Sequence, residues 1–597
     1  KYVILKINNM KKTYITLIAI SSLLASSCDT DYLTQIPKDQ LVIETTFTSY
    51  NNIKAYAWGF YNTFPGYNRG VVDEEFNADL FLNSNSKISY SNWIKQLQTI
   101  PASSGSYSDP YANIRKVNIL LDNIDKSNTI SQAEKDHWRS VGYFFRAYEY
   151  YNLVSKYGDV IWLEHALNDA SPELFAPRTP RNEVTQKMLD NLLFAETNIK
   201  AAGDGPNSIG VHAVRALISR FGLFEGTWRK YHNLGDAEKY IRASATASEK
   251  LMVSFPTLNP NYDLEFNSES LAGVPGIILY KQYADAQITH TLTSAHRNSS
   301  GNWDLTKKAA DMYLLKDGQT RWTSPLFTSD KDPYDEFRNR DKRMLYTILP
   351  PYRVNANNLT FTYDANPKYR EYLDVLTALS DAKHKGEPAR NWQGLVLKQA
   401  PHFRDFNNGQ GFIAGQTGYQ LYKYYNNLLS IQNVDINDAP IFRIAEVLVN
   451  YAEAKFELGE FNQTIANATI NKLRARGGVA DLVVGSEPTD ITRDPSVTAT
   501  LWEIRRERAI ELMGEGYRFN DLRRWKKMNY TDVEQFGIWA KNSDYGNKLT
   551  IQNGAAEGYV TIFGPPPGNF PEYYYLYPIP SNELVLNKNL VQNPGWK

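Results

Sequence analysis

Residues Trp502–Trp525 read WEIRRERAIELMGEGYRFNDLRRW and form the densest run of charged side chains in the chain. Glu503 and Arg506 stand three residues apart, as do Arg508 and Glu511. This spacing places opposite charges next to one another on one face of a helix. The stretch therefore predicts a helix that is held by ion pairs.

Arginines beside aromatic residues also allow a second interpretation of this stretch, a surface that binds polyanions. Acidic residues interleave with the arginines, however, so the stretch is close to neutral: they are Glu503, Glu507, Glu511, Glu515 and Asp521. The whole chain has 65 Lys and Arg against 65 Asp and Glu, and a nucleic-acid binder would show a basic footprint. We therefore expect a structural ion-pair network and no nucleic-acid partner.

The order of these residues closely resembles the C-terminal hallmark of the SusD/RagB family. The matching runs are Arg505–Arg508, Glu511–Leu512, Glu515–Arg518 and Asp521–Trp525. Further similar runs are Leu576–Pro580, Glu583–Leu584, Asn587, Asn589, Gln592–Trp596, Tyr111–Ile114, Val117–Asn118, Arg146–Ala147 and Asn339–Arg343. The last run departs from the family's usual Asp-Pro-Arg because Lys342 stands at the proline.

The resemblance implies a mainly α fold, a scaffold of four tetratricopeptide-like units with a loop-rich irregular face. It also implies a surface lipoprotein of the Gram-negative outer membrane that captures oligosaccharide or polysaccharide. Such proteins sit as a lid on a SusC-like TonB-dependent transporter. Related lids serve peptide transporters, so a peptide-capturing lid stays open as an alternative.

Two stretches independently predict helix–turn–helix repeats, Val211–Met252 and Pro440–Arg476. Small residues let the paired helices approach, and a Gly-Asp or Gly-Glu turn suits a period near 34 residues, as in tetratricopeptide repeats. Thr464 stands where an alanine is expected. Such units need neighbours to bury their faces, which 111–157 and 180–200 could supply. Generic helical hairpins are the alternative.

The organisation that we expect has three parts. Residues 1–27 are an upstream extension and a lipoprotein signal peptide, residues 28–45 are a lipidated tether, and residues 46–597 are a single domain. Within that domain we expect helical repeats at about 111–255 and 440–476, a loop-rich insertion at about 256–435 and the C-terminal family segment at 500–597.

The N-terminal region has the layout of a secretory signal, with Lys11 and Lys12 before the uncharged run Thr13–Ser27. That run is too short to span a bilayer, which takes about 20 residues. The only cysteine, Cys28, follows directly. Leu24–Cys28 resembles a lipobox, although Ala25 stands where the pattern usually has a branched apolar residue.

We therefore expect Cys28 to be lipidated and the protein to be anchored in the outer membrane. Asp29 and Asp31 resemble the signal that sends such lipoproteins to the cell exterior. An ordinary signal peptide with an incidental cysteine is the alternative. Residues 1–9, before Met10, are expected to be an upstream extension.

Catalytic signatures are missing from the sequence. There is no GxSxG nucleophile elbow, no Gly-Lys dipeptide for a P-loop and no HExxH zinc motif. Asp73–Glu75 and Asp435, Asn437 and Asp438 could offer oxygen ligands to calcium, but solvated surface acids are favoured. We expect no enzyme activity, no catalytic residue, no cofactor and no bound metal. A secreted glycoside hydrolase is the alternative, since its two carboxylates are recognised only by their separation.

Glycan binding calls for flat aromatic rings that match the C–H face of a sugar and polar groups at its rim. Loops after the first helices and the central insertion are the regions where such a platform is expected. The candidates are Asn83, Tyr90, Trp93, Tyr283, His296, Trp303 and Trp322. Trp93 is the strongest of them because it lies in a polar Ser-Asn setting. Each aromatic candidate could instead belong to the core.

Overall fold

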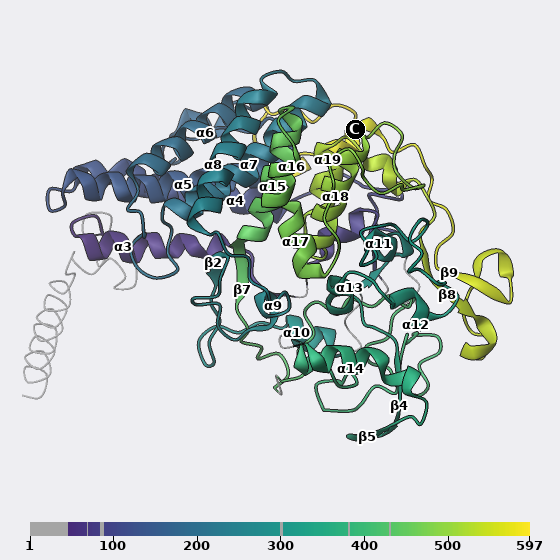
Figure 1. The fold of residues 1–597 in the computed structure, drawn as a ribbon. Helices are drawn as coiled ribbons and strands as arrows, with labels where there is room; N and C mark the ends of the chain where they lie inside the picture. The colour runs from purple at the N-terminus through teal and green to yellow at the C-terminus, as the bar shows by residue number, and fades with distance from the viewer. Residues whose placement is uncertain (1–45, 69, 84–88, 299–302, 380–381, 429–430) are drawn as a thin grey trace, which may run out of the picture.

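The computed structural model describes residues 46–68, 70–83, 89–298, 303–379, 382–428 and 431–597, and the chain is mainly α-helical (Figure 1). The helices are α3 Tyr50–Trp58, α4 Gly105–Asn123, α5 Gln132–Tyr157, α6 Arg181–Asn198, α7 Val211–His232, α8 Ala237–Ser254, α9 Leu264–Asn267, α10 Leu292–His296, α11 Lys307–Met312, α12 Pro333–Phe337, α13 Lys342–Thr347, α14 Glu371–Ala378, α15 Ile444–Glu457, α16 Gln463–Ala468, α17 Ile470–Gly477, α18 Ala499–Glu511, α19 Arg518–Arg524 and α20 Ser581–Leu586. The strands are β1 Phe81–Asn83, β2 Ile277–Lys281, β3 Trp303–Leu305, β4 Tyr352–Asn357, β5 Thr360–Tyr363, β6 Gln399–Ala400, β7 Ala439–Arg443, β8 Phe536–Lys541 and β9 Glu557–Thr561.

The long helices α4 to α8 pack side by side and form one end of the molecule, with α15 against α7 and α8 (Figure 1). Helices α7 and α8 approach closely because glycines face the contact. A Cβ atom at Gly222 would lie 2.7 Å from the carbonyl oxygen of Tyr240. The hydroxyl groups of Ser219 and Ser248 are 2.8 Å apart across the same contact. The predicted helix pair over Val211–Met252 is therefore confirmed.

The second predicted repeat forms with one difference. Its first helix is α15, but its second helix is divided into α16 and α17 at Thr469, where the backbone leaves the helical region (φ −129°, ψ −87°). The hydroxyl of Thr469 donates a hydrogen bond of 2.6 Å to the carbonyl of Ile465. Such back-bonding competes with the regular helix ladder.

The insertion between the two repeats consists of short helices and small sheets, at the other end of the molecule from the long helices (Figure 1). Strand β2 is partly buried, and only its central residue, Leu279, is fully shielded from water. Strand β2 pairs antiparallel with β7, directly before α15. This pairing joins the start of the insertion to the second repeat.

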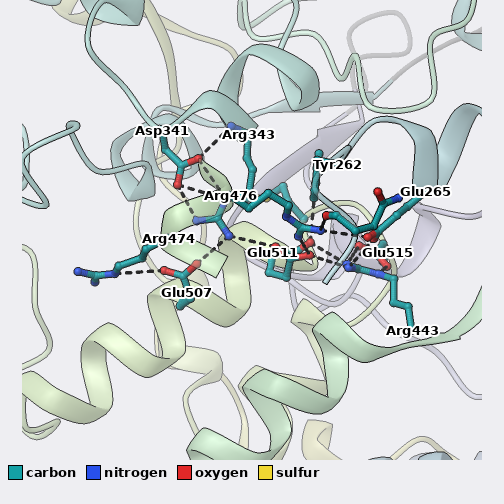
Figure 2. A network of polar contacts seen from close by, with 12 residues as sticks. Tyr262, Glu265, Asp341, Arg343, Arg443, Arg474, Arg476, Glu507, Glu511 and Glu515 are labelled. Atoms are coloured by element: carbon teal, nitrogen blue, oxygen red, sulfur yellow. Dashed lines mark hydrogen bonds and ion pairs between the residues drawn. The ribbon is translucent and has the colours of Figure 1, made fainter. Parts of the chain in front are cut away.

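A buried ion-pair network joins the insertion to the C-terminal helices (Figure 2). The Nη1 atom of Arg343 lies 2.7 Å from Glu507 Oε1 and 3.0 Å from Glu511 Oε2. Arg443 Nη1 lies 2.6 Å from Glu511 Oε1 and 3.1 Å from Glu265 Oε2. Arg474, Arg476, Asp341 and Glu515 complete the set that we call the ion-pair network.

The network confirms the structural role that the charge pattern of 502–525 predicts. Burial alone would raise the pKa of Glu511, but the charges of Arg476, Arg443 and Arg343 outweigh burial. They hold that pKa well below its usual value. The charged side chains of α18 are therefore turned inward and are not available to a polyanion.

Cys28, the lipobox and the tether 28–45 lie outside the described residues, so their predicted roles stay predictions. Within the described ranges, each helix is either too short or too polar to traverse a lipid bilayer.

Candidate functional site

A cleft with a volume of about 530 Å³ lies between the insertion and the C-terminal segment. Helix α11 and Trp322 contribute to it from the insertion. The loop 490–495 and the segment 529–536 contribute from the C-terminal side. We call it the Trp322 cleft. It lies where two parts of the chain meet, a common place for ligand pockets.

Three half-buried aromatic rings line the cleft, those of Trp322, Tyr530 and Phe536. The guanidinium of Arg321 lies 5.5 Å from the centre of the Trp322 ring. The ammonium of Lys308 lies 4.7 Å from the centre of the Tyr530 ring. Trp322 and Tyr530 thus each combine a partly exposed aromatic ring with a cationic hydrogen-bond donor that lies over it.

Buried Asp79 holds one wall of the cleft. Its carboxylate lies 2.7 Å from Lys308 Nζ and 2.8 Å from Arg518 Nε. The hydroxyl of Thr306, the N-cap of α11, donates to the carbonyl of Asp79 and accepts from the N–H of Ala309. The start of α11, and with it Lys308, is therefore fixed against Asp79 and Leu80, which lead into β1.

Carboxylates in the opposite wall are each engaged by protein donors. Asp490 accepts a hydrogen bond of 2.8 Å from Trp502 Nε1 and pairs with Arg506. Asp494 accepts one of 2.8 Å from the hydroxyl of Tyr530 and lies 2.6 Å from Lys527 Nζ.

The electrostatics of Asp79, Asp490 and Asp494 limit what chemistry these three acids can do. Burial alone would raise the pKa values of Asp79, Asp490 and Asp494. The neighbouring donors and positive charges outweigh burial, so all three pKa values lie below their usual range. A glycosidase needs an acid that stays protonated, with a raised pKa. These three carboxylates are held ionised, so they suit hydrogen bonding to hydroxyl groups and not proton donation.

Of the predicted glycan-binding residues, the structure places Trp322 in this cleft. The structure corrects the prediction for Trp93, the strongest candidate. Its side chain is only 5% exposed, so it is a core residue and not a binding surface. It packs against Phe519, Tyr574, Tyr577 and Trp596. The C-terminal tail covers the indole, so it has no free face for a sugar.

The structure also corrects the prediction of glycan binding for four further residues, because all four are buried: Tyr90, Tyr283, His296 and Trp303. The hydroxyl of Tyr90 donates to the carbonyl of Gly564. The rings of His296 and Trp303 lie 4.4 Å apart, and burial lowers the pKa of His296 to about 3. These residues are core aromatics.

Tyr283 and Asn83 occupy structural positions too. The ring of Tyr283 lies 4.6 Å from that of His290, and its backbone N–H donates to Asp438. Asn83, which is half-buried, ends β1 and pairs with Trp303 in the two-stranded sheet of β1 and β3.

The acids considered for calcium bind the chain itself. Asp438 accepts hydrogen bonds from the backbone N–H groups of Leu271 and Tyr283, and Asp435 accepts from Ser294. Glu75 accepts from the N–H of Gly516. Over the ranges that the structure covers, no three His, Cys, Asp or Glu side chains gather as a metal site would require.

Sequence reasoning missed Tyr530 and Phe536, which line the cleft opposite Trp322. The stretch Phe536–Lys541 reads FGIWAK, and its apolar and aromatic content could have indicated a strand. Its alternation is broken by a bulge, so the period of two residues that marks a half-buried strand is not visible.

A larger cavity, about 770 Å³, lies beside the start of α6 and the end of α7, against the C-terminal tail. Its indole, Trp228, is only 3% exposed because His232 stacks on it with ring centres 4.1 Å apart. Arg181 lies over the same ring. A sugar could not reach the Trp228 face, so the Trp322 cleft is the better candidate.

Comparison with known proteins covers both halves of the chain. Residues 275–596 match the SusD family, and residues 31–223 match a family described as starch-binding associating with outer membrane. SusD-like protein P2 of Formosa agariphila is 23% identical over 497 residues, 81% of this chain and 77% of its own. Starch-binding protein SusD of Bacteroides thetaiotaomicron is 23% identical over 481 residues, 79% of this chain and 75% of its own.

Among solved structures, a SusD-like protein from Bacteroides fragilis aligns with a TM-score of 0.66 at 20% identity. The alignment covers 94% of this chain and all of that one. At this identity the likeness concerns the fold. The mainly α, tetratricopeptide-like fold that the resemblance implied is confirmed.

Proposed function

This chain belongs to the SusD family, and we propose that it is a cell-surface lipoprotein that captures oligosaccharide or polysaccharide at the Trp322 cleft. It hands that cargo to a SusC-like TonB-dependent transporter. One observation carries the assignment of the site: a half-buried indole, Trp322, lines a cleft whose rim is dense in fixed hydrogen-bonding groups.

The chemistry of the cleft fits a sugar. A pyranose ring presents C–H groups on its face and hydroxyl groups at its edge. Trp322 and Tyr530 provide flat surfaces for the face. Lys308, which lines the cleft over the Tyr530 ring, and Arg321, which lies over the Trp322 ring, provide donors for the hydroxyl groups. Because the polar side chains already have partners within the protein, they are pre-organised for a ligand.

Membrane attachment is part of the proposal. The match of residues 31–223 to a family described as associating with the outer membrane supports that location. A lipid on Cys28 would tether the folded body through residues 28–45, on the exterior side of the membrane. Several acyl chains on one residue anchor stably, since each buried CH₂ contributes about 0.8 kcal/mol.

The protein acts without catalysis and without a cofactor. The low pKa values of Asp79, Asp490 and Asp494 support this part of the proposal, because they leave these acids without a proton to donate to a glycosidic oxygen. Binding and transfer of intact cargo need no such proton.

Affinity electrophoresis tests the proposal. The mature chain is run in native gels that contain soluble starch, laminarin, xylan or pectin, and at least one polysaccharide is expected to retard it. Trp322→Ala should abolish the retardation. Trp58→Ala removes an indole that is 57% exposed on α3, outside the cleft, and should leave it intact.

Two results would overturn the proposal. Retardation by no glycan, together with heat release on titration with mixed peptides, would identify a peptide lid. Release of reducing ends from any of the polysaccharides would identify a hydrolase. The transporter is tested separately, by solubilising outer membranes that contain the lipidated protein: a TonB-dependent barrel should co-purify, and its absence removes the delivery step alone.

A further inference from the structure

The hairpin of β8 and β9 has two different faces. One face is buried and carries Ile538, Ala540 and Val560. Along the edge of β8, the N–H of Ile538 donates a hydrogen bond of 2.7 Å to the carbonyl of Thr417, which fixes the strand against the insertion. An antiparallel sheet of this kind has its second face toward water. We call that second face the outer face of the hairpin.

A β-bulge gathers aromatic rings on the outer face. Phe536 pairs with Thr561, and Trp539 pairs with Tyr559, so three steps along β8 match two steps along β9. Without the extra residue, Phe536 and Trp539 would point to opposite faces. With it, Phe536, Trp539 and Tyr559 share one face, and all three side chains are half-buried.

This outer face begins at the Trp322 cleft. Phe536 lines the cleft, and its ring centre lies 6.3 Å from that of Tyr559. The hydroxyl of Tyr559 donates to Asp330, which also accepts a bond of 2.6 Å from Arg321. Arg321 in turn lies over Trp322. These contacts connect the cleft to the hairpin without a break.

The far end of the outer face has its own polar donor. The ammonium of Lys331 lies 5.9 Å from the centre of the Trp539 ring. Lys331 is exposed and has no carboxylate partner in the part of the chain that the structure describes. From Phe536 to Trp539 the bulged strand covers about 7 Å, because it matches two steps along β9 at about 3.3 Å per residue. Trp539 thus repeats, one step further along, the ring and donor that Trp322 and Arg321 form in the cleft.

We propose that the outer face of the β8–β9 hairpin is a second part of the binding platform, which a glycan chain reaches only when it is long enough to leave the Trp322 cleft. The substrate class is then polysaccharide or long oligosaccharide, and short oligosaccharides occupy the cleft alone. This inference rests on the proposed function, because it extends the same site.

Chain length is the variable that tests it. Dissociation constants are measured by calorimetry for amylose and maltotriose, or for the polysaccharide that retards the protein best and its trisaccharide. Trp539→Ala should weaken binding of the polymer about 3- to 10-fold, the range that one aromatic contact supports. It should leave binding of the trisaccharide unchanged. Trp539→Phe should keep most of the polymer affinity.

Trp58→Ala is the matched control, because Lys54 lies 5.1 Å from that ring in the same arrangement on α3. It should change neither constant. If Trp539→Ala does not fold, Lys331→Ala, at an exposed side chain, is the second test variant. It should also weaken binding of the polymer and leave binding of the trisaccharide unchanged. Thermal unfolding of each variant checks that it is folded.

Three outcomes overturn the inference. If Trp539→Ala and Lys331→Ala leave the polymer constant unchanged while Trp322→Ala removes binding, the platform ends at the cleft and the proposed function stands. If Trp539→Ala weakens both probes equally, there is one site and no length dependence. If the unaltered protein binds no glycan, the proposed function fails and the inference fails with it.

Discussion

Arg443 Nη1 lies 2.6 Å from Glu511 Oε1, at a place where both side chains are almost completely shielded from water. The same guanidinium also reaches Glu265 and Glu515. A buried charge is tolerated only when it is paired and hydrogen-bonded. The contact therefore fixes β7, α9 and the end of α18 relative to one another (Figure 2).

Arg443→Met is expected to be strongly destabilising. It removes one of the three arginines that pair with buried Glu511 and the main partner of half-buried Glu515, and removing one side of a buried pair costs about 3–5 kcal/mol. The free energy of unfolding from urea denaturation measures the loss. Arg242→Met, at an exposed pair with Glu238, is the control and should leave the midpoint unchanged. Equal midpoints for both variants would contradict a structural role of the network.

Trp93→Ala is expected to lower stability and not affinity. Its indole fills a core position against Phe519 and Trp596, and truncating such a residue costs about 3–5 kcal/mol. Chemical denaturation gives the loss, and calorimetry below the transition gives the dissociation constant of the folded protein for its glycan. If the variant kept its stability but lost glycan affinity, the core role of Trp93 would be contradicted and a role in binding supported.

Gly222→Ala is expected to push α7 and α8 apart. The new Cβ would meet the carbonyl oxygen of Tyr240 at 2.7 Å and the backbone nitrogen of Ser244 at 3.0 Å, and backbone atoms cannot swing aside. Overpacking of this kind costs about 1–3 kcal/mol. Gly59→Ala is the matched control, since no atom lies within 4 Å of its Cβ position. Only the first variant should lower the thermal midpoint.

The Glu75→Gln variant is expected to gain stability relative to the unaltered protein as the pH rises. Burial raises the pKa of Glu75 to about 8, so the folded protein keeps a proton there that the unfolded chain releases near its ordinary pKa of about 4.5. Stability therefore falls between those two values as pH increases. Glutamine cannot ionise, and its carbonyl can still accept from the N–H of Gly516.

The measurement is the difference in unfolding free energy between Glu75→Gln and the unaltered protein, followed from pH 5 to pH 8. We expect the difference to grow by on the order of 1 kcal/mol for each pH unit, the upper limit for one proton. Glu269→Gln, at an exposed side chain, controls for the loss of one negative charge. A difference that is constant with pH would show that Glu75 is ionised in the fold.

Helices and their ends were predictable because the interactions that set them are local. Ser131 and Glu134 have the serine-to-glutamate spacing of a capping box, and the box forms at the start of α5: the N–H of Glu134 donates to Ser131 Oγ, and the N–H of Ser131 donates to Glu134 Oε2. The ion-pair network was predictable in kind, since interleaved acids and arginines balance within one stretch. Its partners on the insertion, such as Arg343, could not be read from that stretch.

Exposure of aromatic residues was not predictable, because it depends on segments far away in the chain. Trp93 lies in a polar setting by sequence, yet Tyr577 and Trp596 cover it from the C-terminal tail. The bulge at Phe536–Trp539 has the opposite effect: it brings two aromatic residues to one face although their spacing suggests different faces. Local patterns show neither effect.

The ion-pair network links positions 265, 341 and 343 within the insertion to positions 443, 474, 476, 507, 511 and 515 in the segment that follows it. Glu265 finds its partners, Arg443 and Arg476, only outside the insertion, and Arg343 also reaches Glu507 and Glu511 there. Chimaeras that exchange the whole insertion between relatives would have to import Glu265, Asp341 and Arg343 together. Redesign confined to the outer face of the hairpin touches none of these residues, and it is there that cargo preference can be altered without disturbing assembly of the chain.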